Sequence, residues 1–208
     1  MIALVGEAAW SQARKMAPAF AQRWRGQWDD IIPFCFGDFI PNLEPVVYFA
    51  IREDGRHRFH YYHVYHYMDW ARTPWGYNHR HDFEGVIIFQ HKQGGEVFAL
   101  ASRCHYVVKI VRDPKPDYTY GTNGPLEKYH WFEIEPRGHG IRPAKESIRG
   151  DWKAYVPGHY RLINMMNPRF LAHWEYIREV FGDRAQMPDV LDLGRWWNNP
   201  MELIKKWG

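Results

Sequence analysis

Residues 78–84 combine side chains that can bind a cation. This segment holds two imidazoles, two carboxylates and one guanidinium: His79, His81, Asp82, Glu84 and Arg80. The β-branched and aromatic run at 85–89 predicts a strand that begins near Asp82. Residues two apart on a strand share a face, so Asp82 and Glu84 should point the same way, and His79 should join them from the preceding loop.

Asp69 completes the predicted cation site. It ends a histidine- and tyrosine-rich segment, 57–70, that reads as a central strand with both faces covered, and only a turn-rich loop separates it from His79. A set of Asp69, His79, Asp82 and Glu84 is rich in oxygen, which favours Mg²⁺, Mn²⁺ or Ca²⁺ over zinc. Arg80 and His81 could orient these ligands. The alternative is a structural charge network in which Arg80 neutralises Asp82 or Glu84.

Two further histidines are candidates for the pocket rim. His105 follows another predicted strand, and His139 lies between two glycines, Gly138 and Gly140. A histidine flanked by glycines is typical of a tight or mobile loop, where packing alone is a weaker explanation. Either residue could instead be structural or simply exposed.

The elements that must position these residues are mostly strands. Period-two patterns at 46–51, 58–68, 83–90, 97–106, 107–111 and 129–135 alternate with turn signals, and the stretches 113–125 and 136–150 read as long loops. Helical spacing predicts one helical segment over residues 1–28, kinked at Pro18, and capping signals at Asn167 and Asn199 predict C-terminal helices within 167–208. We therefore expect one α+β, mainly β domain over residues 1–208, a central antiparallel β-sandwich flanked by helices.

Composition excludes several classes of protein. Aromatic residues make up 17% of the chain, too many for a disordered protein, and a net charge of +3 gives no case for nucleic acid. No apolar run approaches the roughly 18 residues of a transmembrane helix, and the N-terminus lacks the pattern of a signal peptide, so the sequence as written indicates the cytoplasm. Cys35 and Cys104 are too few for a disulfide framework, and buried free thiols are favoured over a bridge.

Residues 78–84 resemble the Gly-His-Arg-His-Asp-Trp-Glu heptapeptide of the necrosis- and ethylene-inducing-peptide-like (NLP) proteins, secreted cytolysins of plant-associated microbes. Five of the seven positions match, and Asn78 and Phe83 depart from the motif. The likeness extends over 59–105 and, more loosely, over the C-terminal quarter. It implies a β-sandwich flanked by helices, with an acidic, cation-binding cavity at one end.

By this resemblance, the metal residues would be Asp69, His79, Asp82 and Glu84, with His105 in the pocket. The ligand would be a glycan or a sphingolipid headgroup, the location would be extracellular, and membrane damage could follow binding. Trp70 and Trp75 would then contact the glycan or the membrane surface. Two other functions stay open: a metal-dependent hydrolase of a phosphoryl or glycosyl substrate, with His79, His81 or His105 as acid or base, and a structural or partner-binding module.

Overall fold

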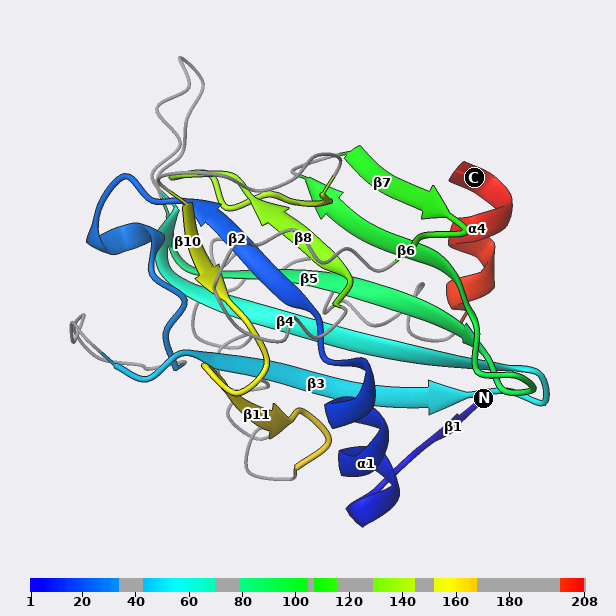
Figure 1. The fold of residues 1–208 in the computed structure, drawn as a ribbon. Helices are drawn as coiled ribbons and strands as arrows, with labels where there is room; N and C mark the ends of the chain where they lie inside the picture. Colours follow the sequence, from blue (N-terminus) through cyan, green and yellow to red (C-terminus); the bar gives the residue numbers. More distant parts are fainter. Residues whose placement is uncertain are drawn as a thin grey trace.

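Two β-sheets form the body of the protein (Figure 1). The computed structural model describes residues 1–33, 43–69, 79–104, 107–115, 129–144, 152–167 and 199–207, with the backbone alone at 69, 79–81, 103, 104, 107 and 207. The larger sheet runs in the order β1 (Ile2–Ala3), β3 (Val46–Glu53), β4 (His57–Asp69), β5 (His79–His91), β6 (Val97–Cys104), β7 (Val107–Arg112), with β11 (Arg161–Asn164) also paired to β3. The smaller sheet runs β10 (Trp152–Tyr155), β2 (Ala19–Arg23), β8 (Trp131–Ile134), β9 (Ile141–Pro143).

The predicted mainly β fold is confirmed, and the pairings are antiparallel except between β11 and β3 and between β2 and β8. The strands expected from period two correspond to β3 through β8. The long loop expected at 136–150 contains β9, and β10 and β11 were not predicted. These three strands have only three or four residues each, too few for an alternating pattern to stand out.

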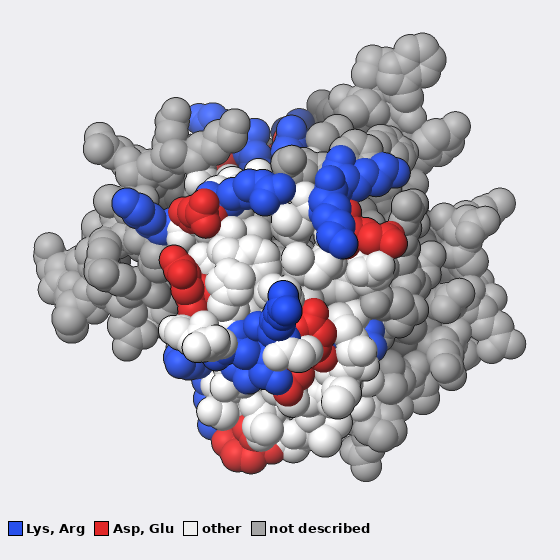
Figure 2. Space-filling model, turned by 90° about the vertical axis from the view of Figure 1, so that its right-hand side faces the viewer, with Lys and Arg blue, Asp and Glu red and all other residues white. Residues whose placement is uncertain are grey.

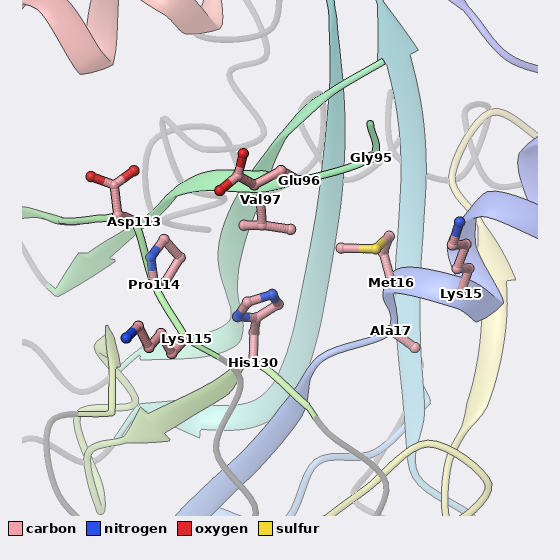
Figure 3. Close-up of a pocket in the computed structure, with 10 residues that line it drawn as sticks. All are labelled: Lys15, Met16, Ala17, Gly95, Glu96, Val97, Asp113, Pro114, Lys115 and His130. Carbon is pink, nitrogen blue, oxygen red and sulfur yellow. The ribbon is translucent and has the colours of Figure 1, made fainter. Parts of the chain in front are cut away.

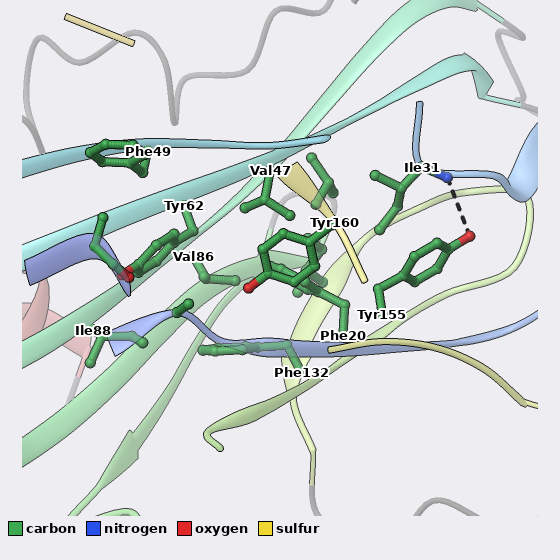
Figure 4. Close-up of a cluster of buried hydrophobic side chains, with 14 of the residues drawn as sticks. Phe20, Ile31, Val47, Phe49, Tyr62, Val86, Ile88, Phe132, Tyr155 and Tyr160 are labelled. Carbon is green, nitrogen blue, oxygen red and sulfur yellow. Dashed lines mark hydrogen bonds between the residues drawn. The ribbon is translucent and has the colours of Figure 1, made fainter. Parts of the chain in front are cut away.

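Hydrophobic side chains cover both faces of the larger sheet. Between the sheets, Phe20 and Phe132 of the smaller sheet pack with Val47, Tyr62 and Val86 of the larger one (Figure 4). The opposite face carries a second cluster that includes Tyr61, Tyr65, Phe83 and Phe89, together with Leu203 and Ile204. The prediction that 57–70 supplies a central strand covered on both faces is therefore confirmed for β4.

The helical prediction for residues 1–28 is correct only in its first part. Helix α1 covers Gly6–Met16, after which Ala17 adopts extended backbone angles and Ala19–Arg23 form β2. Pro18 explains the change, because proline disfavours the helical region for the residue before it. A short 3₁₀ turn, η1 (Gln27–Asp29), follows.

The C-terminal helix α4 (Pro200–Trp207) begins where predicted, and the side-chain amide of Asn199 donates to Glu202 Oε1 at 2.9 Å. The helix predicted from Asn167 and the residue Cys35 lie outside the described residues, as does the side chain of Cys104. No helix among the described residues is long and apolar enough to cross a bilayer.

One end of the molecule carries charges of both signs. At the β3–β4 and β5–β6 hairpins, Glu53 pairs with Arg58 at 3.2 Å and with Lys92 at 3.0 Å. Figure 2 shows basic and acidic side chains interspersed on this face. The described residues therefore form no continuous basic surface here of the kind that nucleic acid binds.

Candidate functional site

Asp82 and Glu84 lie in β5 on the face that is directed at the smaller sheet. They are two residues apart, and Val86 and Ile88, the next residues on that face, belong to the core between the sheets. Opposite them on β4 are His66 and Val64 respectively. Asp82 is 4% exposed and Glu84 9% exposed, so two carboxylates are nearly buried at one end of the sandwich.

The turn between β8 and β9 brings His139 to Asp82. Arg137 and His139 have positive φ angles of 70° and 50°, and the backbone N–H of His139 donates to Glu135 O at 3.1 Å. A non-glycine residue in this region costs free energy, of order 1–3 kcal/mol, and such strain tends to occur at functional sites. The strained turn holds the His139 ring fully buried.

Asp29 at the end of η1 approaches His139 from the other side. Its carboxylate accepts the backbone N–H groups of Arg25 and Arg137, both at 2.6 Å. The contact with Arg137 joins η1 to the β8–β9 turn. Burial alone would raise the pKa of Asp29, but the hydrogen bonds from His139, Arg137 and Arg25 outweigh burial and hold the pKa below its usual value.

His139 bridges the two aspartates. Its Nδ1 lies 3.0 Å from Asp82 Oδ2, and its Nε2 lies 3.3 Å from Asp29 Oδ1. Burial opposes the charged imidazolium, yet the hydrogen bonds and charges of Asp29 and Asp82 raise the pKa of His139 to about 9. A protonated ring then donates to both carboxylates at neutral pH.

His66 packs against this bridge in the opposite charge state. Its ring stacks on His139 with centroids 3.8 Å apart and an interplanar angle of 11°. Burial first, and then the charge of His139, hold the pKa of His66 well below its usual value, although the backbone of Asp29 and Asp30 opposes the shift. A neutral imidazole therefore covers a charged one.

The hydrogen bond from His139 fixes the orientation of the Asp82 carboxylate. Asp82 Oδ2 accepts a hydrogen bond from His139, whereas Oδ1 has no hydrogen-bond partner among the described residues. Carboxylate ligands of metals are commonly oriented in this way by a hydrogen bond to their second oxygen. Asp29, Asp82 and Glu84 thus place three buried carboxyl groups at this end of the sandwich, two of them bonded to the His139 ring.

The predicted residues are brought together only in part. Asp82 and His139 are in contact, and Glu84 is the next residue on the same face. His79 begins β5 instead of lying in a loop, because the β4–β5 ladder continues until Asp69 pairs with His79. The described side chains include no group of three His, Cys, Asp or Glu residues spaced to hold a metal. The side chains of Asp69, His79, Arg80 and His81 lie outside the description, as do the whole residues Trp70, Trp75 and His105.

The sequence reasoning missed Asp29 and the stacking role of His66. Asp29 directly follows the segment 1–28, which was predicted to be helical. Gly26, Asp29 and Asp30 together form a turn signal that marks the start of a separate turn at this point. His66 was recognised only as one of several histidines on a central strand. Its role depends on His139, which is remote in sequence.

Comparison with known proteins supports the fold. No family model and no curated protein matches the sequence. The structure is similar to that of Necrosis and Ethylene inducing Protein 2 from the causal agent of cocoa's Witches Broom disease, at 14% identity and a TM-score of 0.51, over 79% of this chain and 76% of that one. NLPPya in complex with mannosamine gives 18% identity and a TM-score of 0.50, over 76% and 74% of the two chains.

The non-toxic HaNLP3 protein also matches, at 14% identity and a TM-score of 0.50, over 79% of each chain. At these identities the similarity concerns the fold alone, and this chain has the NLP fold in a divergent form.

Proposed function

We propose that the protein binds sugar groups of glycans or glycolipids through a divalent cation held at the Asp82 end of the sandwich. The observation that carries the proposal is the orientation of Asp82 by His139, which bonds Oδ2 and leaves Oδ1 without a hydrogen-bond partner among the described residues. Asp82 and Glu84, which share one face of β5, would hold the cation. When bound, the cation would supply positive charge for sugar hydroxyl groups to coordinate.

Two other observations agree with a sugar ligand. NLPPya, which has this fold, forms a complex with mannosamine. Trp24 is 46% exposed and donates its indole N–H to Asp30, the residue after Asp29, at 3.1 Å. An exposed aromatic ring near the cluster offers a surface on which a sugar ring can pack.

His139 is not placed to act as the acid or base of a hydrolase. His139 is fully buried and both of its ring nitrogens are bonded to carboxylates, so it cannot exchange a proton with a substrate. HaNLP3, which has a similar fold, is a non-toxic protein, so the fold does not by itself imply toxicity. We therefore propose sugar binding as the primary function, with membrane damage as a possible consequence.

The cation site predicts that Asp82→Asn weakens binding of Mg²⁺, Mn²⁺ or Ca²⁺ at least tenfold, because an amide supplies no charge to the ion. Calorimetric titration of chelator-stripped protein would measure this loss. Glu133→Gln is a suitable control, since Glu133 pairs with Arg142 on β9 at 2.6 Å and does not belong to the cluster. Equal affinities in the wild type and Asp82→Asn would show that the cation, if bound, lies elsewhere.

The sugar ligand is tested with the same proteins. Mannosamine should bind the cation-loaded protein and lose affinity after addition of chelator or in Asp82→Asn. Leakage from phosphatidylcholine vesicles, with and without a glycosylceramide, would report membrane damage separately. Sugar binding that survives removal of the cation would contradict the proposed mechanism.

A further inference from the structure

A cavity of about 470 Å³ lies at the opposite end of the sandwich from Asp82. Its walls come from the end of α1, the β5–β6 hairpin, the segment after β7 and the start of β8. Asp82 is near the start of β5, whereas Gly95 lies beyond its last residue, His91. Val97 pairs with Gln90, which is eight residues of strand from Asp82; at about 3.3 Å each, these residues place roughly 25 Å between Asp82 and this wall of the cavity.

The interior of this cavity is apolar around one histidine. Figure 3 shows the side chains of Met16, Val97 and His130 directed toward its middle, with Ala17 and Pro114 beside them. His130 is 8% exposed, and its Nδ1 is buried without a hydrogen-bond partner among the described residues. A buried polar atom of this kind is costly unless a ligand or water satisfies it.

Burial lowers the pKa of His130 to about 4. The ring is therefore neutral at pH 7, with one nitrogen that donates and one that accepts a hydrogen bond. The backbone carbonyl of His130 accepts the N–H of Ala19 at 3.0 Å, which fixes residue 130 against the start of β2.

The wall beside the histidine is also held in place. The side-chain amide of Gln90 donates to Gly95 O at 2.8 Å and lies 3.7 Å from Met16 Sδ, while Gln90 Oε1 accepts a hydrogen bond from His60 at 3.0 Å. These contacts tie the β5–β6 hairpin to the end of α1. The cavity is a prearranged feature of the fold, and its volume is within the usual range for small-molecule sites, about 300–1,000 Å³.

The charges at the edge of the cavity cancel. Two cationic and two anionic side chains surround it: Lys15, Lys115, Glu96 and Asp113. None of the four forms a side-chain ion pair within the described part of the chain. An edge of zero net charge does not select for an ionic ligand.

We propose that this cavity is a second binding site, which takes a small uncharged aromatic molecule that carries a hydroxyl group. The hydroxyl would form a hydrogen bond with the part of the His130 ring that is open to the cavity. The aromatic ring would contact the thioether of Met16, which makes favourable contacts with aromatic rings, and the side chain of Val97. This site does not depend on the cation cluster.

The test uses p-cresol as the probe, with toluene as the matched compound without a hydroxyl group and 4-methylbenzoate as a charged one. Amide NMR spectra of the full chain should show saturable p-cresol shifts centred on Gly95, Val97 and His130. Toluene should bind several-fold more weakly and 4-methylbenzoate more weakly still. The variant His130→Leu should lose about fivefold in p-cresol affinity, as expected for one hydrogen bond, and keep its affinity for toluene.

A second variant tests the site independently, in case His130→Leu does not fold. Val97→Trp should fill the cavity and remove the binding of both p-cresol and toluene, whereas Asp82→Asn should leave p-cresol binding unchanged. Shifts that are absent at 10 mM p-cresol, that scatter over the surface, or that persist in Val97→Trp would overturn the proposal.

Discussion

Acidification from pH 7.5 to pH 5 should reduce the free energy of unfolding by about 6 kcal/mol. Burial lowers the pKa values of His60 and His63 to about 3 and that of His130 to about 4. In the unfolded chain these groups titrate near pH 6.5. Below that pH the histidines are protonated in the unfolded state but stay neutral in the folded state. Their stabilising contribution is complete above pH 6.5 and is lost as the pH falls toward 4.

The size of the effect follows from the number of groups. Each histidine contributes about 1.4 kcal/mol per pH unit below 6.5, or about 2 kcal/mol at pH 5. The loss from these three groups is comparable to the lower end of the total stability of a typical domain, about 5–15 kcal/mol. The lowered pKa of His66 acts in the same direction, and the raised pKa of His139 partly offsets the loss. Urea unfolding curves at the two pH values would measure the difference.

His63 offers a direct check on this origin. It is fully buried on β4, and neither ring nitrogen has a hydrogen-bond partner among the described residues. The variant His63→Phe should reduce the acid sensitivity by about 2 kcal/mol. His159, whose ring is exposed, is the control: His159→Phe should leave the pH dependence unchanged. Equal stability of the wild type at pH 7.5 and pH 5 would mean that these rings are solvated or already protonated in the folded protein.

Replacing His139 by alanine should destabilise the protein by about 3–5 kcal/mol. The substitution leaves two buried carboxylates, 2% exposed at Asp29 and 4% exposed at Asp82, without the positively charged His139 ring between them. Removing one partner of a buried charge network costs this much because the remaining charges stay uncompensated. Chemical unfolding at pH 7 would measure the loss.

Arg142→Ala is a useful comparison on the neighbouring strand β9. The side chain of Arg142 is 46% exposed, and its pair with Glu133 should contribute only about 0–1 kcal/mol. The variant Asp29→Asn should cost less than His139→Ala, because the amide oxygen can still accept hydrogen bonds. A loss at His139→Ala no greater than that at Arg142→Ala would show that the bridge is not a stabilising feature.

Much of the larger sheet was predictable because its strands alternate regularly and end at turn signals. The placement of Asp82 and Glu84 on one face required only the period of a strand. The end of α1 could have been predicted from the sequence, because Pro18 disfavours a helical conformation at Ala17. The helical spacing of apolar residues continues to Trp24, however, and led to the prediction of a longer helix. In each case the information is local.

The bridge itself could not be predicted in this way. Asp29 and His139 are 110 residues apart in sequence, and their contact depends on how the smaller sheet lies over the larger one. The glycines around His139 indicated an unusual backbone, and the structure shows that this backbone turns the ring inward. The sequence pattern alone did not distinguish an inward ring from one at a pocket rim.

The origin of the three bridge residues has a consequence for folding. Asp29 belongs to η1, Asp82 to the larger sheet and His139 to the turn between two strands of the smaller sheet. Contacts between such distant segments require long loops to close and therefore form late. An intermediate with only the larger sheet assembled would contain Asp82 and Glu84 but not the bridge. During refolding, the proposed cation binding should therefore return late, and its appearance should mark the closure of the sandwich.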